Sequence, residues 1–197
     1  MSEGRQIGEV ILDLKNISLR FGGVKALTDI SFDVREHEVR AIIGPNGAGK
    51  SSMLNVINGV YRPQEGDIIF RGEHHRDMNT YAAAKAGIAR TFQNIALFKG
   101  MTVLDNIMTG RNLRMKATIV EQAIHFGRAK REELENRAKV EEIIDFLQIQ
   151  HIRKTPVGRL PYGLMKRVEL ARALAAEPSL LLLDEPMAGM NAEETED

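Results

Sequence analysis

The chain has 197 residues, of which 43% are hydrophobic and 27% are charged, a composition that fits a folded globular protein and excludes disordered and collagen-like classes. Lys plus Arg equals Asp plus Glu, at 27 each, so no net positive charge favours nucleic acid as a partner. The absence of cysteine excludes disulfides, thiolate nucleophiles and Cys-based zinc sites, and it fits a reducing compartment such as the cytoplasm.

The N-terminal sequence MSEGRQIGEV has neither the basic nor the apolar region of a signal peptide. No run in the chain approaches the roughly 20 apolar residues that cross a membrane. If the protein acts at a membrane, we expect another subunit to span it. From Val10 to Val34 short alternating runs predict a small antiparallel β layer, with Ile17, Leu19 and Phe21 on one side.

The next segment has the pattern of a strand, a loop and a helix. Val39–Ile43 is an apolar run that predicts a strand, and Met53, Ile57 and Val60 recur at helical spacing. Between them GPNGAGKSS, at Gly44–Ser52, satisfies the phosphate-loop pattern Gly-x-x-x-x-Gly-Lys-Ser. The alternative, a Gly-rich turn that only caps a helix, does not require the full pattern in this strand–helix context.

The chemistry of such a loop explains its residue types. Glycines let consecutive N–H groups point at phosphate oxygens, and the helix that starts near Lys50 adds the positive end of its dipole. Lys50 then supplies charge to the β- and γ-phosphates, and Ser51 supplies a hydroxyl to Mg²⁺. The predicted ATP-binding residues of the loop are Gly44, Asn46, Gly47, Ala48, Gly49, Lys50, Ser51 and Ser52.

The middle of the chain alternates short strands with one helix. A turn at Arg62–Gly66 precedes a predicted strand over Ile68–Phe70, then a helix is predicted over Ala82–Ala86 and a strand over Ile88–Phe92. Three polar side chains between these elements are interpreted as a solvated loop rather than as metal ligands: His74, His75 and Asp77.

From residue 94 to 158 the pattern is helical, and we predict an inserted helical subdomain that divides a nucleotide-binding core of residues 1–93 and 159–197. Glu135 and Lys139 are expected to form an i,i+4 pair on the exposed face. The apolar face is marked by Val140, Ile143, Ile144 and Leu147.

A second amphipathic helix is marked by Leu164, Val168, Ala171 and Ala175. After it, Leu180–Leu183 has no polar face and predicts a parallel strand covered on both sides.

The leucine strand delivers Asp184 and Glu185 at its carboxyl end, where ligands bind in open α/β sheets. Asp184 is suited to the Mg²⁺ shell, and Glu185 to activating the attacking water as general base. Without the phosphate loop, four leucines and two acids would be an ordinary strand and turn.

With both motifs in place, the chain resembles an ATP-binding-cassette (ABC) ATPase from about Ile11 to Asn191. The resemblance implies an α/β P-loop NTPase with a RecA-like core, an N-terminal antiparallel β layer and an inserted helical subdomain. It also implies that Phe21 stacks on adenine. Gln93, in RTFQ, would contact Mg²⁺ and couple to the membrane subunit.

LPYGLMKRVELARAL, which begins at Leu160, resembles the family signature Leu-Ser-Gly-Gly-Gln, a helix N-terminus that faces ATP bound by a partner subunit. Pro161 replaces the serine, Tyr162 a glycine and Leu164 the glutamine, so the serine hydroxyl contact is lost. Gly163 and the backbone N–H groups after it still serve.

This variant signature, AGMN at Ala188–Asn191 and the sequence of Arg90–Ile107 resemble the branched-chain amino acid importer branch of the family. ATPases of lipopolysaccharide export are close relatives and remain an alternative. The groove near residues 93–108 would dock a short helix of the membrane subunit. Three methionines are candidates to line it: Met101, Met108 and Met115.

The implied function is ATP binding and hydrolysis with Mg²⁺, coupled to integral membrane permease subunits. The chain would pair with a second ATPase subunit, identical or different, on the cytoplasmic face of the inner membrane, with no nucleic acid involved. The family continues to a γ-phosphate-sensing histidine, and no histidine follows Glu185. We therefore expect the sequence to stop short of the family's length, and a module that binds but cannot hydrolyse ATP is the second hypothesis.

Overall fold

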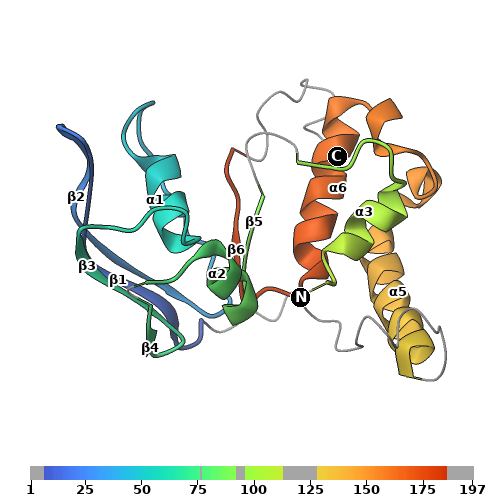
Figure 1. The fold of residues 1–197 in the computed structure, drawn as a ribbon, viewed down its shortest axis with the longest axis horizontal. Coiled ribbons are helices and arrows are strands. Elements are labelled where there is room, and N and C mark those ends of the chain that lie inside the picture. Colours follow the sequence, from blue (N-terminus) through green and yellow to red (C-terminus); the bar gives the residue numbers. More distant parts are fainter. Residues whose placement is uncertain (1–6, 76, 92–95, 113–127, 186–197) are drawn as a thin grey trace, which may run out of the picture. The chain divides into compact units, whose positions relative to one another are not determined.

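The computed structural model describes residues 7–75, 77–91, 96–112 and 128–185. Its backbone falls into two compact units, Met1–Ala86 and Gly87–Asp197. The first unit carries an antiparallel sheet, and the second carries a parallel strand pair and a cluster of helices (Figure 1). No helix in the described part of the chain is both long and apolar enough to cross a membrane.

The sheet of the first unit has the strand order β2-β1-β3-β4, with antiparallel neighbours throughout. This confirms the predicted β layer and extends it by two strands. The strands are β1 (Val10–Phe21), β2 (Val24–Arg35), β3 (Glu65–Phe70) and β4 (Glu73–His74).

Strand β1 carries the apolar face of this sheet, but its alternation changes phase once. Leu12 and Leu14 are buried, and so are Ile17 and Leu19, three and five residues after Leu14. The register shifts between Leu14 and Ile17, where Asn16 has a positive φ of 53°. Such an irregularity reverses the side to which the following side chains point. Ile17 and Leu19 therefore face the same side as Leu12 and Leu14, and both pairs lie in the core.

The described residues of the first unit also form two helices. Helix α1 (Lys50–Ile57) buries Met53, Val56 and Ile57, whereas Val60 lies outside the helix and is 44% exposed. Helix α2 (Thr80–Ala86) begins after Asn79, whose side-chain oxygen accepts from the Ala82 N–H at 2.9 Å. An Asn in this position satisfies an N–H group that lacks a partner within the helix.

The strand predicted over residues 39–43 is not formed. A strand requires a hydrogen-bonded ladder, and no strand among the described residues pairs with this segment. Val39 and Ile43 are accordingly 98% and 92% exposed.

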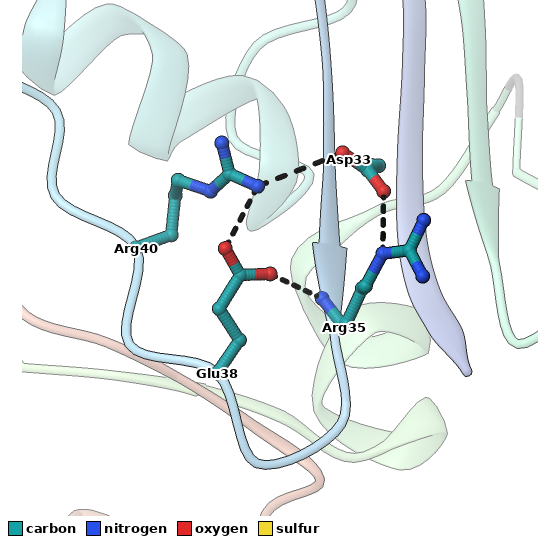
Figure 2. A network of polar contacts seen from close by, with 4 residues as sticks. All are labelled: Asp33, Arg35, Glu38 and Arg40. Carbon is teal, nitrogen blue, oxygen red and sulfur yellow. Dashed lines mark hydrogen bonds and ion pairs between the residues drawn. The ribbon is translucent and has the colours of Figure 1, made fainter. Parts of the chain in front are cut away.

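A charge network holds the start of this segment beside the end of β2 (Figure 2). The Arg40 guanidinium lies 2.7 Å from a Glu38 carboxylate oxygen and 3.6 Å from Asp33. The second Glu38 oxygen accepts from the Arg35 N–H at 2.9 Å, and the Arg35 Nε also contacts Asp33. The turn that leads from β2 toward the phosphate loop is therefore fixed by four side chains.

In the second unit, β5 (Ile88–Arg90) pairs in parallel with β6 (Leu180–Leu182). Ile88 and Leu182 are buried, whereas Leu183 is 43% exposed, so the leucine run is only partly covered within the described residues. The predicted parallel direction is confirmed, whereas the predicted cover on both faces is not found among the described residues.

Helices α3 (Val103–Thr109), α5 (Arg128–Phe146) and α6 (Tyr162–Ala175) contact one another (Figure 1), and their buried side chains share one core. Two 3₁₀ turns, Gln150–Ile152 and Val157–Arg159, connect α5 to α6. The predicted apolar faces of both long helices are confirmed by a core that includes Val140, Ile144, Val168, Ala171 and Ala175, with Ile143, Leu147 and Leu164 packed against it.

The predicted pair between Glu135 and Lys139 is wrong. Glu135 instead accepts from Arg131 at 3.0 Å, and Lys139 donates to Glu142 at 2.8 Å. Alternative partners one turn away compete on an exposed helix face, where each such pair stabilises by only a few tenths of a kcal/mol. The hydrogen bond that Lys139 donates to the Glu142 carboxylate raises the pKa of Lys139. The boundaries of the inserted subdomain, residues 94–158, stay a prediction.

Candidate functional site

The phosphate loop folds over its own lysine. Lys50 is the first residue of α1, and its Nζ donates to the carbonyl oxygens of Gly44 at 2.7 Å and Pro45 at 2.9 Å. An ammonium group has three donors, so two of them are given to the loop. The Lys50 ammonium is therefore held against the Gly44–Pro45 end of the loop, and the residue itself is at the start of the helix.

Two glycines of the loop have left-handed backbone conformations. Gly47 has a φ of 83° and Gly49 a φ of 88°, where other L-residues are strained by about 1–2 kcal/mol. A Cβ on Gly49 would also lie only 2.5 Å from the Ala26 carbonyl oxygen of β2. Gly49 is thus required both by its conformation and by the close approach of the loop to β2.

A mostly apolar hollow of about 390 Å³ borders the loop. Its wall includes Leu27 of β2, Ile42 and Ala48, together with Lys50 and Met53 of α1. It therefore offers apolar surface next to the one charged group of the loop.

Phe21 lies at the end of β1, outside the wall of this hollow, and is 45% exposed. Its ring meets Tyr61 edge to face, with the centroids 4.9 Å apart. The exposed ring surface is compatible with stacking on a base, and the adenine role of Phe21 stays a prediction.

The carboxylate pair follows β6 in the second unit. Asp184 is 6% exposed, whereas Glu185 is exposed and has a φ of 47°. A left-handed conformation costs a non-glycine residue on the order of 1–3 kcal/mol and persists at sites where the surroundings impose it. The turn therefore gives the two carboxylates different surroundings, one enclosed and one open.

Arg90, at the end of β5, is the charged partner that sequence reasoning missed. Its Nη2 donates to Asp184 Oδ2 at 2.8 Å, and the two side chains are 6% and 7% exposed. The sequence did contain a signal for this pair, because a cation inside the apolar run Ile88–Phe92 requires a buried anion nearby.

The signature segment lies where helix α6 begins. Leu160 is 9% exposed and Pro161 occupies the N-cap position without a side-chain cap. Tyr162 is the first helical residue and is 39% exposed, whereas Gly163 is buried. An uncapped N-terminus leaves backbone N–H groups that suit an anion, as the resemblance implies.

Gln93 lies outside the described residues, as do Met115 and the segment Ala188–Asn191. Close to Gln93 in sequence, the Ala96 carbonyl accepts from Arg172 of α6 at 2.6 Å. Desolvation by burial lowers the pKa of Arg172. This bond ties α6, which carries the signature segment, to the chain that follows Gln93.

A hollow of about 290 Å³ lies along α3. Met101 and Met108, two of the predicted groove methionines, line it, together with Leu104 and the charged Glu133 and Arg137 of α5. Flexible thioethers framed by charges suit an adaptable contact surface.

The side-chain oxygens predicted to bind Mg²⁺ are of the kind that bind this ion together with phosphate. Among the described residues, no group of three His, Cys, Asp or Glu side chains could hold a metal ion alone. Mg²⁺ in nucleotide sites is held by one or two protein oxygens plus substrate phosphates. Ser51 and Asp184 each carry a side-chain oxygen of that kind, and their roles as Mg²⁺ ligands stay a prediction.

Comparisons with known proteins point in one direction. A family model described as "ABC transporter" matches residues 27–188. The high-affinity branched-chain amino acid transport ATP-binding protein LivG of Salmonella typhimurium is 34% identical over 194 residues, which are 97% of this chain and 75% of that relative.

Solved structures agree. The ADP conformation of MJ1267, an ATP-binding cassette of an ABC transporter, has a TM-score of 0.79 and 34% identity, with 95% of this chain and 73% of that chain covered. A dimeric post-hydrolysis state of the cassette MJ0796, bound to ADP and Pi, has a TM-score of 0.75 and 25% identity, with 94% and 78% covered. These likenesses confirm the P-loop NTPase fold class.

Proposed function

Because this chain belongs to the ABC transporter family, as an ATP-binding subunit, we propose that it hydrolyses ATP to power an importer of branched-chain amino acids. The observation that carries the chemistry is the loop around Lys50, whose ammonium is held at the start of α1 by two carbonyl oxygens. The importer assignment is supported by the likeness to the LivG protein over 97% of this chain.

The proposed binding step uses the residues of the first unit. Phe21 stacks on adenine, and the N–H groups of the loop cradle the phosphates. Lys50 moves one or more of its donors from the Gly44 and Pro45 carbonyls to the β- and γ-phosphate oxygens. Ser51 contributes its hydroxyl to the bound Mg²⁺.

The proposed hydrolytic step adds the residues of the second unit. Mg²⁺, when bound, neutralises charge on the β- and γ-phosphates. Asp184 and Gln93 hold its shell, and Glu185 takes a proton from the water that attacks the γ-phosphorus while ADP leaves. Leu160, Pro161, Tyr162 and Gly163 face the ATP of a second ATPase subunit.

The proposed location is the cytoplasmic face of the inner membrane, against integral permease subunits. The hollow along α3 supports this contact, because its methionines offer an apolar surface of adaptable shape. The family-level alternatives are a binding module without turnover and the ATPase of a lipopolysaccharide-export system.

The test reconstitutes the chain with its membrane subunits in vesicles and measures Mg-ATP turnover and leucine uptake together. Uptake that depends on turnover supports the proposal. Turnover without leucine uptake would overturn the importer assignment and leave the ATPase, and nucleotide binding without turnover would favour the binding module.

A further inference from the structure

Arg90 and Asp184 form a buried pair on neighbouring parallel strands, and one member is the proposed Mg²⁺ ligand. We propose that Arg90 is a positioning residue, which orients the Asp184 carboxylate and thereby sets the Mg²⁺ concentration that tight nucleotide binding requires. This inference rests on the proposed nucleotide site. It adds to that site a residue that lies outside the phosphate loop and outside the pair of carboxylates.

The backbone fixes the geometry of the pair. Arg90 is the register partner of Leu182, and the Thr91 N–H donates to the Leu182 carbonyl at 3.0 Å, so the ladder continues past Arg90. Asp184 follows Leu182 by two residues, and burial alternates along the three positions at 6%, 43% and 6%. Asp184 and Leu182 therefore face the same side, and the long Arg90 side chain spans the offset.

Burial and the planar guanidinium together restrict the geometry of the contact between Arg90 and Asp184. The side chains of Arg90 and Asp184 are 6% and 7% exposed, so bulk water does not readily replace either partner in the pair. A planar guanidinium donates along fixed directions, so the 2.8 Å bond to Oδ2 restricts rotation of the carboxylate. The carboxylate is thereby aligned before nucleotide and Mg²⁺ arrive.

A purely structural ion pair is the competing interpretation. Buried ion pairs are weak evidence for stability, because an apolar pair of similar volume often serves as well. Partners that orient metal ligands typically alter metal affinity about 10- to 100-fold when removed. The two interpretations therefore differ in the Mg²⁺ dependence of binding, whereas both allow a loss of stability.

The test measures binding of a fluorescent ATP analogue while free Mg²⁺ is varied, and it records Mn²⁺ electron paramagnetic resonance as a direct metal probe. For Arg90→Met we expect unchanged binding without Mg²⁺ and a Mg²⁺ midpoint raised about 10-fold or more. Asp184→Asn should give a similar shift, and the double variant should give no further one. Arg90→Lys keeps the charge and one donor and should shift the midpoint less.

Arg111→Met is the matched control. Arg111 is also buried at the side chain, pairs with Glu177 at 3.0 Å, and donates to Asn136 and to the Ala175 carbonyl. Its loss should lower the thermal midpoint and leave the Mg²⁺ midpoint unchanged, because none of these partners belongs to the proposed site.

The outcomes separate the inference from the function it rests on. If Arg90→Met loses stability as Arg111→Met does, but keeps a Mg²⁺ midpoint equal to that of the wild type, Arg90 is only structural and the inference is overturned. If Arg90→Met fails to fold, Arg90→Lys decides, because an unshifted midpoint together with an unchanged Mn²⁺ spectrum in that variant would also overturn the inference. If the wild-type chain binds no nucleotide at any Mg²⁺ concentration, the proposed function itself fails.

Discussion

At the residue scale, Lys50 is the group on which we expect nucleotide binding to depend most directly. A charge-assisted hydrogen bond to phosphate contributes roughly 1.5–3 kcal/mol, so we expect Lys50→Ala to weaken ATP binding by about 10- to 150-fold. The substitution also frees the Gly44 and Pro45 carbonyls, which the ammonium now bridges. Calorimetric titration with Mg-ATP measures the loss.

Lys85→Ala is the control for this prediction, since Lys85 is an exposed lysine of α2 in the same unit. It should bind ATP as the wild type does. Equal affinities for Lys50→Ala and the wild type would contradict the phosphate-loop assignment.

Glu185 is expected to act on chemistry rather than on binding. Glu185→Gln keeps the shape of the side chain and removes the base, so turnover should fall by about 10²- to 10⁴-fold while ATP affinity stays unchanged. Turnover is measured by phosphate release and affinity by the same calorimetry. Glu73→Gln, at an exposed position of β4, is the control, and wild-type turnover in Glu185→Gln would assign the base to another residue.

At the element scale, the stability of the second unit is expected to depend on the shared face of α3, α5 and α6. Ile144 of α5 is fully buried in this core, so Ile144→Ala should lower the free energy of unfolding by about 2–5 kcal/mol. Leu134, on the same helix, is 59% exposed, and Leu134→Ala should change it by less than about 1 kcal/mol.

Urea unfolding followed by circular dichroism measures both variants. Similar losses for the two would show that the packing of α5 does not stabilise the unit.

Most elements were predictable because their signals are local. The phosphate loop, the helix after it, the antiparallel layer and the apolar faces of α5 and α6 each depend on a spacing within one segment. The strand over residues 39–43 was predicted with equal reason and failed, because a strand needs a partner, and apolar periodicity does not reveal whether one exists.

Partner choice explains the other differences at this scale. Glu135 and Lys139 have the right spacing for a pair, yet each has another charged residue within reach. Conversely, Arg90 and Asp184 are 94 residues apart in sequence and meet only because β5 and β6 are register partners. Contacts set by strand pairing cannot be derived from a short sequence window.

At the scale of the whole molecule, the proposed mechanism requires two chains at each ATP. In the proposed two-fold dimer the phosphate loop of one chain would face the signature helix of the other, so each site would be composite. Two inactivating substitutions can therefore complement each other if one lies in the phosphate loop and the other in the signature helix. In this proposal Lys50 belongs to the chain that binds the nucleotide, and Tyr162 to the chain that faces it.

Tyr162→Asp is a suitable signature variant because it should not damage the helix it starts. An acidic residue in the first turn of a helix is favourable by about 0.3–1 kcal/mol, and Tyr162 is a partly exposed position. The same negative charge would repel the γ-phosphate of the partner's ATP. Tyr162→Asp should thus bind ATP normally and fail to hydrolyse it.

Mixing Lys50→Ala and Tyr162→Asp chains should then restore activity. One site of each mixed dimer combines an intact loop with an intact signature, whereas the other site carries both defects. If chains mix at random, half of the dimers are mixed and about a quarter of all sites are intact, so turnover should recover to about a quarter of wild type when the sites act independently. Phosphate release at a fixed total chain concentration measures it, with each variant alone as the control. If both variants fold and the Tyr162→Asp chain binds ATP, a mixture without recovered turnover would contradict a dimer of identical chains. Such a result would favour a different ATPase subunit as the partner.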